Sequence, residues 1–480
     1  MKMPERALVG IDVGTSAVKA CIWRADGFYR ASKRLVGVTG PHSEQDPEGI
    51  WAAVVECLRQ VLCGQDAATV AGVGLSGHGP SLMAVNGHGE PLCNIITWLD
   101  GRPLKNDAVR SEYERLCPGR EASGPCYEAT ALWIRHQLEG ASQCKLLQPK
   151  DYIGLKLTAD ACIDSSAFSC GAWSYDPAAA EHWIVKLLPQ VVNPWEPLGV
   201  VTQSASECTG LPCGIPVAAG GIDAFVEALG AGIIEQGIAC DSTGTSTCIS
   251  LVVEDDSNLP AVDHVAPQMK LAVIPVSYSG GSLAWAMSVL VPEAGGVGAD
   301  WTQTLSSVVS NTRLGADGLV FIPHLMGQRS PKCNPHATGA FAGLRPGHTR
   351  FDMIRAVIEG CAYTMKECVD ALMPHHDLTE FRAVGSGARH DAWLQIKADV
   401  LGVPVIRMGI QEGALVGAVI LAGVAGGVFA DVRSGVDAAV RPAERFEPNG
   451  ASEGAYRKSY AAFRRAEDAL GFELDGGNAT

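Results

Sequence analysis

Two segments of the chain, one at its start and one near its middle, carry the same order of residues. The first reads IDVGTSAVKACI from residue 11, and the second reads CDSTGTSTCISLV from residue 240. In each, an aspartate precedes a Gly-Thr-Ser turn, and the turn leads into an apolar run typical of a strand. A repeat of this kind indicates an internal duplication. We therefore expect two related domains, each beginning with a strand, a tight turn and a second strand.

The residues around each repeat alternate between strand and helix patterns. Residues 7–36 read as two consecutive hairpins, and Asp46 followed by Pro47 is typical of a helix start. A helical pattern at 352–368 precedes a strand pattern at 403–406. This alternation predicts an α/β fold in which helices cover a parallel or mixed sheet.

The length of 480 residues exceeds one compact core, and no low-complexity segment or long linker is visible. We divide the chain into domains at 1–245 and 246–480. Because no linker separates them, we expect the two domains to share an interface, with a cleft between them.

Charge and hydropathy argue against several classes of protein. Lys and Arg number 37 against 52 for Asp and Glu, a formal net charge of −15, which argues against a broad nucleic-acid surface. No run of 18 uncharged apolar residues occurs, so no membrane span is expected. Asp12 and Lys19 stand too early for a signal peptide. The apolar stretch 413–429 is short and rich in glycine, and it predicts a closely packed helix.

The 16 cysteines contain no CxxC pair. Several replace small apolar residues in core-like runs, as Cys21 and Cys361 do. We interpret them as buried, reduced thiols of a cytoplasmic protein. The alternatives are a disulfide or metal framework and a thiol-based redox enzyme.

The first repeat suits phosphate and Mg²⁺. Gly14 lets the backbone approach phosphate oxygens, and the hydroxyls of Thr15 and Ser16 donate further hydrogen bonds. Asp12 can hold hydrated Mg²⁺, and Lys19 follows the turn. An ordinary hairpin turn is the alternative. Because the pattern occurs twice, two such loops could grip a triphosphate from both sides.

Two other segments place polar residues between a strand and a helix. Asp223 follows two glycines that leave room for the close approach of another group, and it starts a helix, where an acid is well placed to accept a proton. The alternative is a helix N-cap. Gly385-Ser386-Gly387 suits the flat face of a nucleoside or its phosphate, although this pattern is weak by itself.

With these motifs, the chain resembles the FGGY carbohydrate kinases, within the actin, hexokinase and heat-shock ATPase fold. The resemblance rests on ordered motifs, which are DVGTS at 12–16, WLDGR at 98–102, GID at 221–223, GTS at 244–246, GAFAGLRPGHTRFDMIRAVIEG from 339 and GSGARHDAWLQIKADVLGVPV from 385. It implies two ribonuclease H-like domains with an interdomain cleft. It also implies phosphorylation of a sugar or polyol by ATP with Mg²⁺. No nucleic-acid or membrane partner is implied, and a homodimer is allowed.

The resemblance assigns roles to single residues. Asp223 takes the position of the catalytic base, and Asp12 that of the acid on the Mg²⁺ side. The residues matched to ATP binding are Gly14, Thr15, Ser16, Lys19, Gly244, Thr245, Ser386, Gly387 and Asp391. The residues matched to the sugar are His78, Gly79, Trp98, Asp100, Arg102, Asp223 and Phe225.

The resemblance is nearest to xylulokinases, but the substrate loop departs from their Gly-Gln-Met-His-Gly. The Met-His pair falls on Gly79 and Pro80, and Ala224 stands where xylulokinases usually carry an amide. His78 either replaces a lost hydrogen bond or is a satisfied loop histidine. We therefore expect a ketopentose such as xylulose, with weak discrimination. The alternatives are another pentulose, a deoxy-sugar, a polyol, or a non-catalytic ATP-binding regulator, against which Asp223 argues.

Overall fold

A computed structural model describes residues 6–35, 43–117, 126–138, 144–169, 183–254, 257, 259–295, 299–373 and 377–470. The chain forms two compact units, each built from segments that are distant in sequence. The first unit comprises Met1–Ile234, Ala261–Leu271 and Gly413–Val440. The second comprises Glu235–Pro260, Ala272–Glu412 and Arg441–Thr480.

A mixed sheet forms the centre of the first unit. Its strands lie side by side in the order β11 (Pro197–Val200), β12 (Pro216–Ala218), β5 (Val70–Gly77), β1 (Ala7–Val13), β2 (Ala17–Arg24) and β3 (Gly27–Arg34), with β13 (Gly221–Ile222) also beside β5. β1, β2 and β3 pair antiparallel in sequence, which confirms the two predicted hairpins. β1, β12 and β13 each run parallel to β5.

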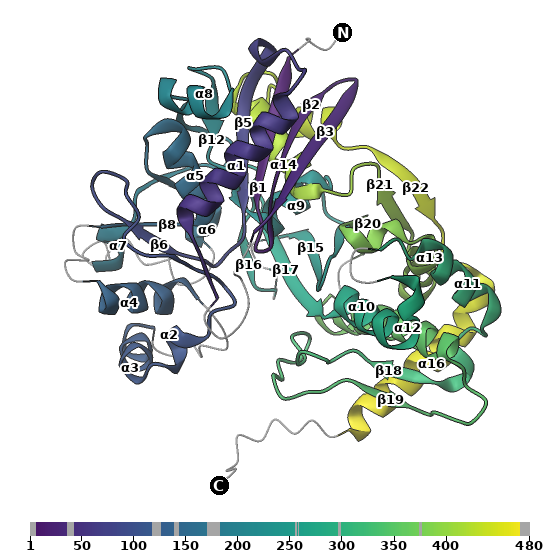
Figure 1. Ribbon diagram of the computed structural model, residues 1–480. Helices are drawn as coiled ribbons and strands as arrows, with labels where there is room; N and C mark the ends of the chain where they lie inside the picture. The colour runs from purple at the N-terminus through teal and green to yellow at the C-terminus, as the bar shows by residue number, and fades with distance from the viewer. Residues whose placement is uncertain are drawn as a thin grey trace. The chain divides into compact units, whose positions relative to one another are not determined.

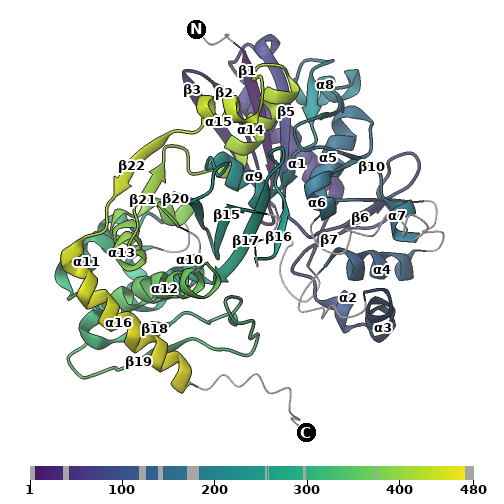
Figure 2. The ribbon, with the colours of Figure 1, turned by 180° about the vertical axis from the view of Figure 1, so that it is seen from behind.

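Helices cover both faces of this sheet. Helix α1 (Pro47–Leu62) lies across β2 and β3 (Figure 1), and the Asp46 carboxylate caps it by accepting the N–H groups of Glu48 and Gly49, as predicted. Helix α14 (Gly413–Ala425) packs on β1 and β5 and is seen near them in Figure 2. α14 is apolar on all sides. Glycines in the sheet and in the helix let the two backbones come into contact.

Glycine contacts also hold α9 (Asp223–Gly230) against α14. A Cβ on Gly417 would lie 1.9 Å from the Val226 carbonyl oxygen, and one on Gly230 would lie 1.9 Å from the Gly413 carbonyl oxygen. A Cβ on Gly74 would lie 1.9 Å from the Ala418 carbonyl oxygen. The closely packed helix predicted from 413 is therefore confirmed, and it fixes the position of α9 relative to the sheet.

Smaller elements complete the first unit. They are β4 (Glu44–Gln45), β6 (Met83–Val85), β7 (Ile95–Ile96), α2 (Arg102–Lys105), α3 (Asp107–Leu116), α4 (Tyr127–Gln137), β8 (Lys145–Leu147), α5 (Pro149–Thr158), β9 (Cys162–Asp164), α6 (Ser165–Ser169), α7 (Trp183–Leu187), β10 (Gln190–Val192), α8 (Gln203–Thr209), β16 (Ala261–Asp263) and α15 (Val432–Ala439). The short strand β4 pairs antiparallel with β7.

The second unit repeats the arrangement of the first sheet. Its strands lie in the order β17 (Lys270–Ser277), β15 (Thr247–Val253), β14 (Ile238–Thr243), β20 (Glu380–Val384), β21 (Val405–Met408) and β22 (Pro442–Phe446). β14 is antiparallel to β15 and parallel to β20, as β1 is to β2 and β5. The strand predicted at 403–406 begins two residues later, after Pro404, which has no N–H to donate to a ladder.

Helices pack against this second sheet through a shared apolar core. The remaining elements of the unit are α10 (Ser279–Leu290), α11 (Thr302–Asn311), β18 (Val320–Ile322), β19 (Ala340–Ala342), α12 (Arg350–Leu372), the 3₁₀ turn η6 (Ser386–Arg389), α13 (Asp391–Leu401) and α16 (Gly450–Ala469). Helix α12 contains the helix predicted at 352–368 and begins at a Thr349–Asp352 capping box. Both units are therefore α/β with mixed sheets, as predicted.

Candidate active site

Three neighbouring parallel strands of the first unit bring two acidic residues to one edge of the sheet. The register pairs Asp12 of β1 with Ser76 of β5, and Ser76 with Gly221 of β13. Asp223 begins α9 two residues after Gly221. Both predicted acids therefore lie at the carboxyl ends of these strands, which is where open α/β sheets bind ligands.

Asp12 is buried and keeps capacity to bind a cation. One carboxylate oxygen accepts the Ser76 hydroxyl at 2.9 Å, and the other lies 3.8 Å from the Lys19 ammonium. A carboxylate has about four acceptor positions, so these two contacts do not saturate it. The sequence analysis missed Ser76, because only the strand register places it beside Asp12.

Asp223 is the first residue of α9 rather than its N-cap. The cap position is Ile222, and the Asp223 carboxylate accepts only the N–H of Ala224, at 2.8 Å, among the bonds found in the described part of the chain. Removal from water, and then the negative charges of Asp12 and Glu227, raise the pKa of Asp223 to about 7. A partly exposed carboxyl with this pKa can accept a proton near neutral pH.

The two glycines before Asp223 make room for the protein itself and not for a ligand. Gly220 has φ of 71°, and a Cβ there would lie 1.8 Å from the Leu75 carbonyl oxygen. A Cβ on Gly221 would lie 2.5 Å from a Val265 methyl group. The group whose close approach we expected is therefore the backbone of β5 together with a neighbouring side chain.

The Thr15 turn is held by two side chains. The Trp98 indole N–H donates to the Thr15 hydroxyl at 2.9 Å, and the Gln45 amide donates to the Thr15 carbonyl at 2.8 Å. Gly14 closes the turn through its N–H to the Ala17 carbonyl, and Ser16 is exposed. The resemblance matched Trp98 to the sugar, whereas its indole N–H binds the turn at Thr15.

His78 is buried, and both of its ring nitrogens have protein partners. Nδ1 lies 2.8 Å from the Ser81 hydroxyl, and Nε2 lies 2.7 Å from the Gln45 amide oxygen. Burial lowers the pKa of His78 to about 3, so the ring is neutral at physiological pH. These are the contacts of a satisfied loop histidine.

The other predicted sugar residues lie around the same loop. Gly79 packs on Ile222, where a Cβ would come within 3.2 Å of the isoleucine side chain, and Phe225 is buried. Asp100 is buried and accepts the main-chain and side-chain N–H groups of Arg102 at 3.0 and 2.9 Å. The Arg102 guanidinium also pairs with Glu44, so Asp100 and Arg102 neutralise each other within the protein.

The second turn lies in the second unit. A Cβ on Gly244 would meet no atom of the described chain within 4 Å, so packing alone does not require glycine there. The Thr245 carbonyl accepts the Gly281 N–H at 2.9 Å, which joins the turn to α10. Asp241 pairs with the buried Lys397 at 2.6 Å, and Lys397 also donates to Thr243 at 2.8 Å.

Gly387 has a structural task that the sequence did not predict. We expected glycine there to leave room for adenosine, but a Cβ would lie 2.5 Å from the Thr243 methyl group. Ser386 is exposed at the end of β20. Asp391 forms an ion pair with Arg407, which also donates to the Ala388 carbonyl at 2.8 Å and so braces this loop.

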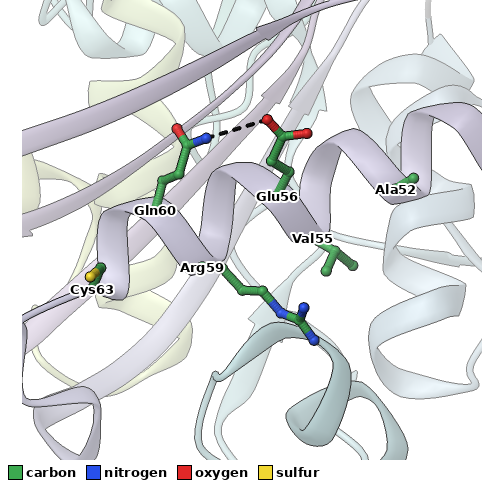
Figure 3. Close-up of a pocket in the computed structure, with 6 residues that line it drawn as sticks. All are labelled: Ala52, Val55, Glu56, Arg59, Gln60 and Cys63. Carbon is green, nitrogen blue, oxygen red and sulfur yellow. Dashed lines mark hydrogen bonds between the residues drawn. The ribbon is translucent and has the colours of Figure 1, made fainter.

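One hollow of the first unit lies along α1 (Figure 3). It is lined by Ala52, Val55, Glu56, Arg59, Gln60 and Cys63. Gln60 donates to Glu56 at 3.3 Å, and Arg59 donates to the Cys208 carbonyl at 2.8 Å. None of the residues predicted to bind sugar or nucleotide lines this hollow.

Further observations concern metals, membranes and thiols. Among the residues that the structure describes, no three His, Cys, Asp or Glu side chains gather as metal ligands. The described helices include none that is long and apolar enough to cross a membrane. Cys21 and Cys361 are buried as predicted, and burial raises the pKa of the Cys361 thiol to about 12.

Comparisons with known proteins agree on one family. Residues 7–230 match the N-terminal domain, and residues 240–426 the C-terminal domain, of the FGGY family of carbohydrate kinases. The chain is 29% identical to a xylulose kinase of Staphylococcus epidermidis, over 96% of each chain. It is 26% identical to a gluconokinase of Bacillus licheniformis, also over 96% of each. The solved xylulose kinase of Lactobacillus acidophilus shares the fold, with a TM-score of 0.84 at 23% identity over 97% of this chain and 98% of that one.

Proposed function

This chain belongs to the FGGY family of carbohydrate kinases, and we propose that it transfers the γ-phosphoryl group of ATP to a hydroxyl of a ketopentose such as xylulose, with Asp223 as the general base. The observation that carries the proposal is the position of Asp223. Its carboxyl group has a pKa of about 7 and stands at the same sheet edge as Asp12.

The proposed reaction requires little covalent chemistry from the protein. Phosphoryl transfer has a loose transition state, so positioning and charge neutralisation supply most of the rate. A sugar hydroxyl does not ionise at neutral pH by itself. Asp223 therefore orients this hydroxyl and takes its proton late in the reaction, for which a carboxyl pKa of about 7 is well suited.

Asp12 fits the role of the Mg²⁺ ligand. Mg²⁺ prefers one or two carboxylates and completes its shell with water and phosphate oxygens, so a protein cluster of three ligands is not needed. Asp12 offers a carboxylate that Ser76 and Lys19 leave unsaturated. When bound, Mg²⁺ supplies charge neutralisation on the phosphates.

The turns at Gly14 and Gly244 suit the phosphates of ATP. Each offers backbone N–H groups and hydroxyls in a tight turn. At Gly244 the open space around the missing Cβ supports a role beyond packing, since no described atom requires glycine there. The exposed Ser386 at the end of β20 is a suitable contact for the adenosine side.

The charges around the sugar loop favour a neutral substrate over gluconate, which the gluconokinase relatives suggest as a second candidate. A sugar acid would need a cation for its carboxylate. Arg102 is already paired with Asp100 and Glu44, and the buried Lys150 lies 2.8 Å from Asp164. A ketopentose carries no charge and needs neither of these cations.

ADP release across a panel of D- and L-xylulose, D- and L-ribulose, common polyols and gluconate tests the proposal. We expect the highest kcat/KM for a ketopentose. The ratio of kcat/KM between the best sugar and the others should stay below about a thousandfold. Gly79, Pro80 and Ala224 offer no side-chain hydrogen bonds, and each missing bond removes about 1 kcal/mol of discrimination. A higher kcat/KM for gluconate than for every ketopentose would show that the charge argument is wrong.

A further inference from the structure

We propose that Gln45 is a positioning residue that holds the phosphate turn and the sugar loop in one fixed arrangement. The inference rests on the proposed function, because it assigns the two loops to phosphate and sugar. Five residues of the first unit form a closed ring of hydrogen bonds, called the ring here. They are Thr15, Gln45, His78, Ser81 and Trp98.

Each hydrogen bond of the ring has an ordinary donor–acceptor distance. Gln45 donates through Nε2 to the Thr15 carbonyl at 2.8 Å, and its Oε1 lies 2.7 Å from His78 Nε2. His78 Nδ1 lies 2.8 Å from the Ser81 hydroxyl, which accepts the Trp98 main-chain N–H at 3.0 Å. The Trp98 indole N–H returns to the Thr15 hydroxyl at 2.9 Å and closes the ring.

The Thr15 carbonyl determines which group donates and which accepts in each hydrogen bond from Gln45 to Ser81. The Thr15 carbonyl can only accept, so the amide nitrogen of Gln45 must face it and the amide oxygen must face His78. His78 Nε2 must then carry the proton, and Nδ1 must accept from the Ser81 hydroxyl. The ring therefore requires neutral His78 in the Nε2–H tautomer, and the low pKa of this imidazole is consistent with that requirement.

The ring is anchored through the strand pair β4–β7. Gln45 is in β4, which pairs with β7 two residues before Trp98. Successive side chains of a strand point to opposite sides, and the preceding residue Glu44 accordingly binds Arg102 instead. The two residues of β4 thus hold different loops, and only Gln45 reaches the phosphate turn.

Burial makes the ring costly to break. The exposed fractions of Gln45, His78 and Ser81 are 5, 1 and 0%, so a lost partner leaves a buried polar group unpaired. The loop that starts at His78 continues to Gly79, which packs on Ile222, the residue before Asp223. Loosening the ring would therefore displace the phosphate turn relative to the base.

Gln45→Met tests the proposal, because methionine keeps the length of the side chain and removes both amide bonds. Misplacement of reacting groups by about 1 Å can cost on the order of 100-fold in rate, so we expect kcat to fall at least about tenfold. KM for ATP and sugar should change less than about threefold, since both ends of the Gln45 amide bind protein atoms. The effects of Gln45→Met and Trp98→Phe should be less than additive, because both release Thr15.

Thr97→Val is the matched control. The Thr97 hydroxyl donates to Ser43 at 2.6 Å, just beyond the end of the same strand pair. Thr97 is buried like Gln45 but lies outside the ring. We expect Thr97→Val to lower Tm about as much as Gln45→Met while kcat stays near that of the wild type. A Gln45→Met kcat within threefold of wild type, or an equal loss of kcat in Thr97→Val, would overturn the proposal.

Histidine ¹⁵N NMR of the whole protein reads the ring without any turnover. The His78 signal is identified by its loss in His78→Gln. The Nε2–H tautomer supports the ring, and the Nδ1–H tautomer overturns it. If the wild type phosphorylates no compound of the panel, the proposed function fails, and this measurement still decides whether the ring exists.

Discussion

Asp223→Asn should give a kinase that is inactive and yet more stable than the wild type at pH 8. The carboxyl pKa of Asp223 rises from 3.8 to about 7 in the folded protein, chiefly through desolvation and then through Asp12 and Glu227, partly offset by the hydrogen bond from the Ala224 N–H and by Lys19. The folded protein therefore binds this proton more tightly than the unfolded chain does. Stability is accordingly lost as the pH rises from about 4 to about 7.

The magnitude follows from the two pKa values. A change from 3.8 to about 7 corresponds to a penalty on the order of 4 kcal/mol for the ionised form. Asparagine removes this penalty, but it can leave one buried N–H unpaired, at a cost of about 1–3 kcal/mol. We expect a net gain on the order of 2 kcal/mol at pH 8. In a unit of this size, that gain raises Tm by roughly 4–8 °C.

The assay pairs thermal unfolding with ADP release for wild type and Asp223→Asn at pH 4.5 and pH 8. We expect the Tm advantage of the variant at pH 8 only, together with a loss of kcat of about 100-fold or more. ATP binding should persist, because amide and carboxylate have nearly equal volume. A helix N-cap would instead give little change in Tm at either pH, because asparagine caps a helix about as well as aspartate does. A variant that is less stable than wild type at pH 8, or that turns over normally, would refute the assignment.

Four other outcomes follow. The kcat of the wild type should rise about tenfold from pH 6 to pH 8, as a base with a pKa near 7 ionises, and a flat pH profile would contradict this. Asp12→Asn should raise the Mg²⁺ concentration needed for half-maximal rate by at least about tenfold. Gly244→Val should raise KM for ATP without loss of Tm, whereas Gly387→Leu should lower Tm as well, because its side chain meets Thr243. Lys397→Met should lower the free energy of unfolding by about 3–5 kcal/mol, measured in urea, because a buried carboxylate loses its partner.

The sequence predicted those features that depend on short-range patterns. Hairpins, the Asp46 cap and the turn before Asp223 are each specified by residues a few positions apart. The role of Gln45 was beyond such patterns, because its partners Thr15 and His78 lie 30 and 33 residues away and meet only in the folded unit. Gly387 shows the same limit. A GxG pattern predicts a tight turn, but not whether a ligand or Thr243 occupies the space beside it.

The two repeats are similar in sequence, but their aspartates have different surroundings. Counting back from the turn glycines, the counterpart of Asp12 is Ser242, since each stands two residues before glycine and pairs with the next parallel strand. Asp241 is one residue earlier, and side chains alternate along a strand, so it points to the other face and meets Lys397. Among the described residues, the first unit therefore has an acid at this position beside the turn, whereas the second has Ser242. The second unit keeps the turn and uses its aspartate to hold Lys397 of α13. In the proposed function, the metal ligand and the base therefore both come from the first unit.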